Sequence, residues 1–291
     1  MIIPYLVHIL ILIGIYLIVI TSLNLALGYS GLLNLGHVAL FGIGAYTSTL
    51  LVLRGIPFFV AFLAAGLLAG FFGIFLVFAT KRLKGDYYAL ASLGFAFVIY
   101  SLLSNLTKIT RGPLGIPGIP RATFFGFMLE ENLLYLIFVS AIALVSLLVL
   151  SRIVSSGFGV LLAAMRDDET ALRMLGINTQ RLKYVTMSIS AFFVGIAGSL
   201  LAHYLSYIDP NIFSIHELIL VLTIVVVGGL ASLKGSIIAT FVIISLAELV
   251  RFVQLPSSII GPGRQIVYAL VLLFILMKQP RGLYGRIDIH D

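Results

Sequence analysis

Long apolar segments dominate the chain, and several run for about 20 residues without a charged side chain. The first, residues 5–27, contains no Asp, Glu, Lys or Arg. A helix needs about 20 mostly apolar residues to cross the hydrocarbon core of a bilayer. Of the 291 residues, 61% are apolar and 10% are charged. A soluble fold of this length would need far more polar surface, so lipid is the expected surroundings of the chain.

We therefore predict an all-α, polytopic membrane protein with about eight to ten transmembrane helices. This composition excludes a soluble enzyme and a nucleic-acid-binding protein. The candidate spans are residues 5–27, 36–53, 57–80, 86–107, 131–150, 183–207, 214–231, 235–253 and 264–279. The first span lacks a cationic leader and a small-residue cleavage motif, so we expect a retained helix and not a signal peptide. Residues 1–291 are expected to form one transmembrane domain.

Basic residues predict the orientation of these helices and explain the net charge of +7. Lys81, Arg82 and Lys84 share one short connection, and further basic residues cluster after position 151 and near the C-terminus. With these groups and Lys234 in the cytoplasm, 12 of the 18 Lys and Arg lie inside, as the positive-inside rule requires. The C-terminus is then cytoplasmic and, with nine spans, the N-terminus lies outside.

Two glycine-rich breaks interrupt the apolar segments with the same pattern. Residues 28–36 (GYSGLLNLG) and 228–235 (GGLASLKG) both contain Gly-Leu-x-x-Leu. Glycine costs about 1 kcal/mol relative to alanine inside a helix, so it marks breaks or close contacts. Paired breaks in two halves of a transporter indicate an internal repeat with a substrate site between the halves. Ordinary loops or packing faces are the simpler interpretation.

Residues 151–182 are a long polar segment between two spans. Ser155 or Ser156 is suited to begin an amphipathic helix there, and Gly176 and Asn178 are suited to end it. Apolar residues at helical spacing form its stripe: Leu161, Met165, Leu172 and Leu175. The stripe suits either the bilayer surface or a groove of a cytoplasmic protein. Three of the four charges at 166–169 are negative, which disfavours anionic headgroups and favours a protein partner.

Several motifs then resemble one transporter family. Residues 159–178 (GVLLAAMRDDETALRMLGIN) resemble the cytoplasmic coupling segment of branched-chain amino-acid ABC permeases, most closely the M-type subunit. Five further blocks occur in the family's order: residues 27–37 (LGYSGLLNLGH), 41–46 (FGIGAY), 85–90 (GDYYAL), 110–120 (TRGPLGIPGIP) and 227–232 (VGGLAS). Together these blocks extend over nearly the whole chain.

The sequence departs from the family pattern at three places. Val160 stands where the family often has Arg, Ala171-Leu172 replaces paired alanines, and Arg111 replaces the first glycine of an external Thr-Gly-Gly. These departures leave the coupling role intact and weaken the prediction of substrate.

The resemblance implies a permease subunit that forms half of a translocation path and imports branched-chain or related apolar amino acids. It implies two cytoplasmic ABC ATPase subunits, a second related permease subunit and an extracytoplasmic solute-binding protein, in the plasma (inner) membrane of a prokaryote. The residues expected to couple to the ATPases are Arg166, Asp167, Asp168, Glu169, Ala171, Leu172 and Gly176.

The chain itself is expected to be non-catalytic and to bind no cofactor or metal. It has no P-loop motif, and no lysine is followed by Ser or Thr, so ATP–Mg is expected in the partner subunits. It also lacks His-Glu-x-x-His, the motif of zinc proteases. Ser199 and His203 have the spacing for a dyad on a helix, but packing or a hydrogen bond to a neighbouring span is the better interpretation.

Substrate passage is predicted at the two breaks, through Asn34, Gly36, His37, Gly228, Gly229 and Ser232. Broken helices expose N–H groups that bind a carboxylate, and apolar walls suit an aliphatic side chain. Among ionisable residues, Glu248 is expected to pair with Arg251, and Asp86 to favour a helix N-terminus. Two alternatives stay open: an ABC permease for another small polar solute (urea or amide, sugar, nucleoside), and an ion-coupled secondary transporter.

Overall fold

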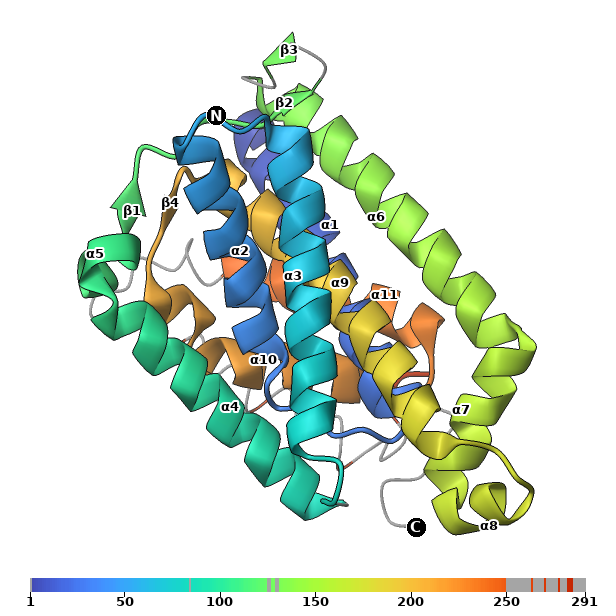
Figure 1. Ribbon diagram of the computed structural model, residues 1–291. Helices are drawn as coiled ribbons and strands as arrows, with labels where there is room; N and C mark the ends of the chain where they lie inside the picture. Colours follow the sequence, from blue (N-terminus) through green and yellow to red (C-terminus); the bar gives the residue numbers. More distant parts are fainter. Residues whose placement is uncertain are drawn as a thin grey trace.

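The computed structural model describes residues 2–249, except 84, 125–126 and 129–130, together with residues 263, 270, 277 and 282–284. These residues form a bundle of helices (Figure 1). The longer helices are α1 (Ile2–Asn24), α2 (His37–Leu53), α3 (Phe58–Ala79), α4 (Asp86–Asn105), α6 (Asn132–Ser155), α7 (Gly157–Asp167), α9 (Thr179–Leu205), α10 (Ile215–Gly228) and α11 (Leu233–Leu249).

Short elements connect the long helices. They are α5 (Thr107–Thr110), α8 (Glu169–Met174), β1 (Ile116–Pro117), β2 (Thr123–Phe124), β3 (Phe127–Met128), β4 (Tyr207–Ile208), a π-helical turn (Leu25–Tyr29) and 3₁₀ turns (Gly112–Leu114 and Pro210–Phe213). Strand β1 pairs antiparallel with β4, and β2 with β3. The β1–β4 pair ties the loop after α4 to the end of α9.

The prediction of a polytopic, all-α membrane protein is confirmed. Within the described residues, six segments are long and apolar enough to cross a membrane: Ile3–Tyr29, Phe58–Ala79, Asp86–Asn105, Asn132–Ser155, Thr179–Leu205 and Pro210–Gly228. Helices α2 and α11 are shorter, with 17 residues each. Eight of the nine predicted spans thus coincide with helices, and the ninth, 264–279, lies almost wholly outside the described residues.

Helix α9 is the centre of the bundle. In its most apolar stretch 78% of the residues are buried, against 22% in α4 and 28% in α6, which form the splayed outer edges in Figure 1. It packs mainly on α3 and α2. A Cβ atom at Gly44 of α2 would overlap the backbone of Gly195 in α9. Such close backbone contact between small residues is the usual basis of helix packing in lipid.

The basic connections gather at one end of the bundle, as the orientation argument predicts. Lys81 and Arg82 follow α3, whose end lies on the side of α7 and α8, whereas Arg54 follows α2 at the opposite end (Figure 1). Asp86 opens α4 in its first turn, as predicted, where a negative charge favours the helix dipole. The predicted pair of Glu248 and Arg251 is not tested, because Glu248 belongs to α11 but Arg251 lies outside the described residues.

The polar segment contains two helices, so the prediction of a single amphipathic helix is wrong. Helix α7 ends at Asp167, and Asp168 adopts an extended conformation and caps α8. Its carboxylate accepts hydrogen bonds from the N–H groups of Thr170 and Ala171. An Asp that offers its carboxylate to free N–H groups favours a new helix start over continuation of the old one. We call residues 157–176 the coupling segment.

The ends of this segment partly follow the prediction. Ser156 caps α7, accepting a hydrogen bond from Phe158 N–H. Asn178, in contrast, begins α9 and does not end the preceding helix. Of the predicted apolar stripe, Met165 and Leu172 are buried, but Leu175 is 79% exposed. Leu172 and Leu175 both follow the break at Asp168, but α8 ends at Met174, so Leu175 lies beyond the helix that buries Leu172.

Ser199 and His203 form hydrogen bonds that hold α9 against its neighbours. Ser199 donates to Ser48 Oγ at 2.7 Å, and Ser48 lies 2.8 Å from His203 Nε2. His203 Nδ1 lies 2.7 Å from the carbonyl oxygen of Pro120. Because a carbonyl only accepts, His203 donates from Nδ1 and accepts at Nε2. The hydrogen bonds to a neighbouring helix are confirmed, and they anchor the loop that precedes β2.

Candidate functional site

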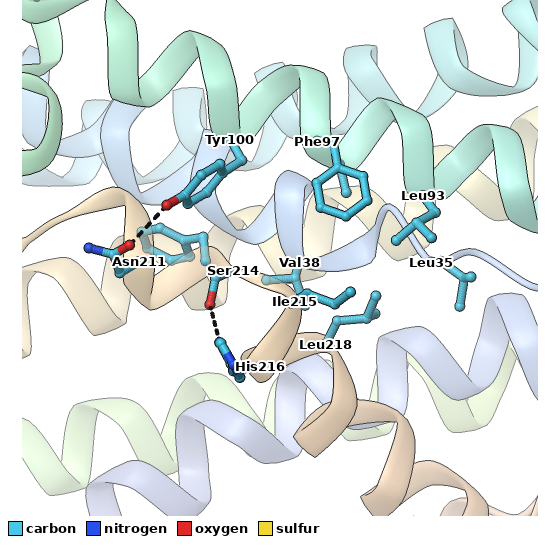
Figure 2. Close-up of a pocket in the computed structure, with 12 residues that line it drawn as sticks. Leu35, Val38, Leu93, Phe97, Tyr100, Asn211, Ser214, Ile215, His216 and Leu218 are labelled. Atoms are coloured by element: carbon cyan, nitrogen blue, oxygen red, sulfur yellow. Dashed lines mark hydrogen bonds between the residues drawn. The ribbon is translucent and has the colours of Figure 1, made fainter. Parts of the chain in front are cut away.

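A cavity of about 540 Å³ lies between α4, the start of α2 and the start of α10. We call it the α4 pocket (Figure 2). Its lining residues are Leu35, Val38, Leu93, Ala96, Phe97, Tyr100, Asn211, Phe213, Ser214, Ile215, His216 and Leu218. Its volume lies within the range of pockets for small molecules, about 300–1,000 Å³.

One end of the α4 pocket is polar. Tyr100 donates a hydrogen bond to the side-chain oxygen of Asn211 at 2.9 Å, and Ser214 Oγ lies 3.5 Å from His216 Nδ1. Ser214 precedes α10, and within the described part of the chain no side-chain hydrogen bond caps this helix start. The first N–H groups of a helix and its positive dipole end favour a negatively charged group. The polar end is therefore suited to a carboxylate.

The other end of the α4 pocket is apolar. Leu35, Leu93 and Leu218 lie together there, with Phe97 beside them, away from the polar pair Tyr100 and Asn211 (Figure 2). Burying apolar surface stabilises a bound aliphatic group by about 25 cal/mol per Å². The pocket thus offers polar and apolar ends in line, the arrangement that an amino acid with an aliphatic side chain requires.

The two glycine-rich breaks contact each other at a second place, which we call the break junction (Asn24, Gly28 and residues 228–236). Asn24 Nδ2 lies 3.3 and 3.2 Å from the carbonyl oxygens of Gly229 and Ser232, and 2.7 Å from Ser236 Oγ. Its Oδ1 accepts the N–H of Ala231 at 3.0 Å. One fully buried amide therefore satisfies polar groups of the interrupted helix that lipid would leave unpaired.

The break junction also contacts the coupling segment. Arg166 Nη1 donates to the carbonyl oxygen of Gly28 at 3.1 Å. The side chain of Arg166 packs over Gly31, where φ is +71° and a Cβ would come within 2.9 Å of Arg166 Cγ. Near the C-terminus, Leu283 N–H donates to the carbonyl oxygen of Val227 at 2.8 Å. Segments far apart in sequence thus meet at the end of the bundle that carries α7 and α8.

The predicted passage residues of the first break are buried outside the lining of the α4 pocket. Asn34 Oδ1 accepts the N–H of Gly36 at 3.0 Å, and its Nδ2 has no partner within the described part of the chain. His37 Nε2 lies 3.1 Å from Ser22 Oγ on α1. Leu35 and Val38, their neighbours in sequence, do line the pocket.

The passage residues of the second break belong to the break junction. Gly228 accepts a hydrogen bond from Tyr284 N–H, and Gly229, with φ of +100°, ends α10. Ser232 Oγ accepts the N–H of Gly235 at 3.1 Å. The structure brings these residues close to Gly28 and away from the α4 pocket. Their role in substrate passage stays a prediction.

The charged residues of the coupling segment differ in their surroundings. Asp167 is exposed and pairs with Arg166, whereas Glu169 binds Arg173, Thr179 and Lys183. Burial raises the pKa of Glu169, but the hydrogen bonds from Lys183 and Thr179 and the charges of Lys183 and Arg173 outweigh it, so the net pKa is lowered. Ala171 is exposed and Leu172 buried. Gly176, with φ of +82°, follows α8.

The sequence did not lead us to several residues in or next to the α4 pocket and the break junction. Asn24 had a visible signal, a single amide inside an apolar span, which is costly in lipid unless it is satisfied. Ser214 precedes an apolar segment, which is the pattern of a helix start. Glu217 carries the same signal as Asn24, a polar side chain in an apolar segment, and its carboxylate accepts a hydrogen bond from Tyr16 on α1. Tyr100 and Asn211 carry no sequence signal, because only the fold brings them together.

Comparison with known proteins identifies one family of transport proteins. The family model described as "Branched-chain amino acid transport system / permease component" matches residues 5–277. The permease protein LivM of the high-affinity branched-chain amino acid transport system of Escherichia coli (strain K12) is 34% identical, over 92% of this chain and 67% of LivM.

More distant relatives agree. LivH of the same Escherichia coli transport system is 23% identical, over 94% of this chain and 92% of LivH. A probable LivM of Methanocaldococcus jannaschii is 24% identical, over 93% of this chain and 90% of that protein. No solved structure matches the chain. The matches extend over both breaks, the coupling segment and the α4 pocket, and the chain belongs to the family of branched-chain amino acid transport permease components.

Proposed function

We propose that the chain is the membrane-spanning permease subunit of an ATP-driven importer of branched-chain or related apolar amino acids. The α4 pocket carries this proposal, because its polar end at Ser214 and its apolar end at Leu93 match the two parts of such a cargo. Family membership and the printed names of LivM and LivH support the same cargo. The largely apolar lining disfavours sugars, nucleosides and urea, which need polar partners along their whole length.

The proposal includes partner subunits. Two cytoplasmic ATPases that use ATP–Mg would dock on the coupling segment, where Val160, Met174 and Leu175 expose 69%, 82% and 79% of their surface. Exposed apolar side chains on a short amphipathic segment are typical of a helix that lies in a partner's groove. A second, related permease would complete the path, as the LivM and LivH pair suggests. An external binding protein would deliver the cargo.

The coupling segment then faces the cytoplasm of a prokaryotic cell, and the C-terminus lies on the same side. The basic connection at Lys81 and Arg82 and the contact of Leu283 with Val227 support this orientation. Arg166 gives the coupling segment a direct contact with Gly28. Through it, movement of the coupling segment would reach the break junction, and from there α10 and the wall of the α4 pocket.

Uptake by the reconstituted complex tests the proposal. Proteoliposomes with both permeases, the ATPases and the binding protein should take up leucine, isoleucine and valine only with ATP. Competition with urea, ribose and a nucleoside should leave leucine uptake unchanged. Uptake that follows an ion gradient without the ATPases, or cargo preference for the polar solutes, would overturn it.

A matched pair of variants tests docking. Leu175→Asp should reduce leucine uptake at least tenfold, because a charge replaces an exposed apolar contact of about 1.4 kcal/mol or more. Leu114→Asp, equally exposed (84%) but in the 3₁₀ turn after α5, is the control for general damage. Equal uptake by the two variants, both folded, would contradict docking on the coupling segment.

A further inference from the structure

A second cavity, of about 220 Å³, lies between the coupling segment, the first break, the start of α4 and α9. We call it the coupling pocket. Its lining includes Leu32, Leu83, Tyr88, Met165, Arg166 and Lys183. It shares no lining residue with the α4 pocket, so it is a separate site.

The charges of the coupling pocket favour an anion. Arg166, Lys183 and Glu169 line it, and Glu169 is also paired with Arg173, outside the lining. The carboxylate of Glu169 is thus saturated by its own partners. Lys183 donates to Glu169, and an ammonium group has three N–H donors. Arg166 pairs with Asp167, which lies outside the lining, and donates to the carbonyl oxygen of Gly28, which together use three of its five N–H donors. Arg166 and Lys183 therefore retain donors for a second acceptor.

The side chain of Tyr88 gives a second, independent indication of a ligand in the coupling pocket. It lines the coupling pocket, only 5% of its surface is exposed, and its hydroxyl has no hydrogen-bond partner within the described part of the chain. Most buried polar side-chain groups have a partner, and an unpaired one is costly. A ligand oxygen that accepts from this hydroxyl would remove the cost.

Size and apolar lining narrow the class of ligand. At about 30 Å³ per water molecule, 220 Å³ corresponds to roughly seven waters, which is too small for a nucleotide. Leu32, Leu83 and Met165 give part of the lining an apolar surface, which suits a short aliphatic chain better than a bare inorganic anion. A ligand with one carboxylate and a short aliphatic group matches both kinds of lining residue.

We propose that the coupling pocket binds a small aliphatic carboxylate and thereby joins the coupling segment to α4 and α9. The carboxylate lies between Arg166, Lys183 and Tyr88, and the aliphatic part lies against Leu32 and Leu83. The carboxylate of a released cargo molecule and that of another cytoplasmic acid share this chemistry. The inference concerns binding alone, so it can fail or hold independently of the proposed transport function.

The chain contains no tryptophan, which allows a direct measurement. Leu83→Trp, at a lining position that is 37% exposed, places a single tryptophan in the full chain, held in nanodiscs of zwitterionic lipid. Isovalerate should shift its fluorescence saturably, and should raise the melting temperature of the unmodified chain. Isoamylamine, with the same alkyl group and the opposite charge, should do neither.

Two tyrosine variants supply the matched control. Tyr88→Phe should weaken isovalerate binding about fivefold, since it removes one hydrogen bond, and it should leave folding intact because its hydroxyl has no partner. Tyr87→Phe, next in sequence and 73% exposed, should bind like the parent chain. Equal affinity of the two variants for isovalerate would overturn the proposal. The absence of any fluorescence or melting-temperature change with isovalerate would also overturn it.

Further arms separate the sources of the carboxylate. If leucine binds as well as isovalerate, the ligand is a released cargo molecule. If isovalerate binds and leucine does not, the ligand is another cytoplasmic acid. Either result supports a carboxylate site. Inorganic phosphate that binds more tightly than isovalerate would overturn the carboxylate class. Loss of the isovalerate response in nanodiscs of anionic lipid would assign the pocket to a lipid headgroup and overturn a free ligand.

Discussion

The break junction and the α4 pocket are built from the same kinds of residue for opposite purposes. At the junction, Asn24 saturates the polar groups of an interrupted helix and glycines bring backbones into contact. At the pocket, no side chain among the described residues caps the start of α10, and none of them fills the cavity next to it. A helix end that the protein satisfies is structural, whereas one that it leaves open is available to a ligand.

The largest expected effect is on the junction. A Cβ at Gly235 would overlap the carbonyl oxygen of Gly228, so Gly235→Ala should destabilise the protein by about 3 kcal/mol or more. Gly94→Ala, in α4 with no atom near the new Cβ, should be neutral or stabilising by up to about 1 kcal/mol. Equilibrium unfolding in mixed micelles measures both. If both variants unfold alike, the close contact between the breaks is wrong.

The second-largest loss of stability is expected for Asn24→Leu. This substitution conserves size but removes the partner of the Ala231 N–H and of the Gly229 carbonyl oxygen, whereas the carbonyl oxygen of Ser232 keeps its hydrogen bonds from Ser236. Each unpaired buried group costs about 1–3 kcal/mol, so a loss of at least about 2 kcal/mol is expected. Asn105→Leu is the control, because Asn105 is exposed and its amide bonds only to Ser101. The same unfolding measurement should leave this control near the parent.

At the pocket the expected effect is on transport and not on stability. Leu93→Trp should fill the apolar end of the α4 pocket and lower leucine uptake about tenfold, which equals about 1.4 kcal/mol, with unchanged unfolding. Leu90→Trp, on the same helix but 66% exposed, should transport normally. Uptake kinetics and unfolding curves of the pair decide the point. Normal uptake by Leu93→Trp would remove the pocket from the cargo path.

The smallest effect concerns pH and the coupling segment. The pKa of Glu169 is lower in the folded chain than its ordinary value. Its ion pairs therefore stabilise the segment above the ordinary Glu pKa of about 4.3, and this stabilisation is lost as the pH falls through the lowered folded-state pKa. The protection factor of α8 in hydrogen exchange, which corrects for the pH dependence of a free amide, should fall in acid. Glu169→Gln should abolish this dependence, whereas Asp167→Asn, with its side chain 66% exposed, should keep it.

Several features of the fold follow directly from the sequence. Eight of the nine spans predicted from apolar segments of about 20 residues coincide with helices of the described residues, because lipid requires each span to satisfy its own backbone. Ser156 and Asp86 mark helix starts where expected. The break in the coupling segment is harder to predict, because Asp167 and Asp168 are adjacent and both are suited to begin a new helix. Only contacts around it, such as those of Glu169 with Thr179 and Lys183, fix the break.

The sequence by itself determined the membrane class, the spans, the basic end and the family, since each depends on local composition or on residues close together in the chain. The tertiary structure alone decided which helix end is satisfied and which is open. Asn24 meets Ser236 across 212 positions, and Tyr100 meets Asn211 across 111. Contacts at such separations depend on how the helices pack, and a pattern of glycines and apolar residues along the chain does not encode which ends will meet.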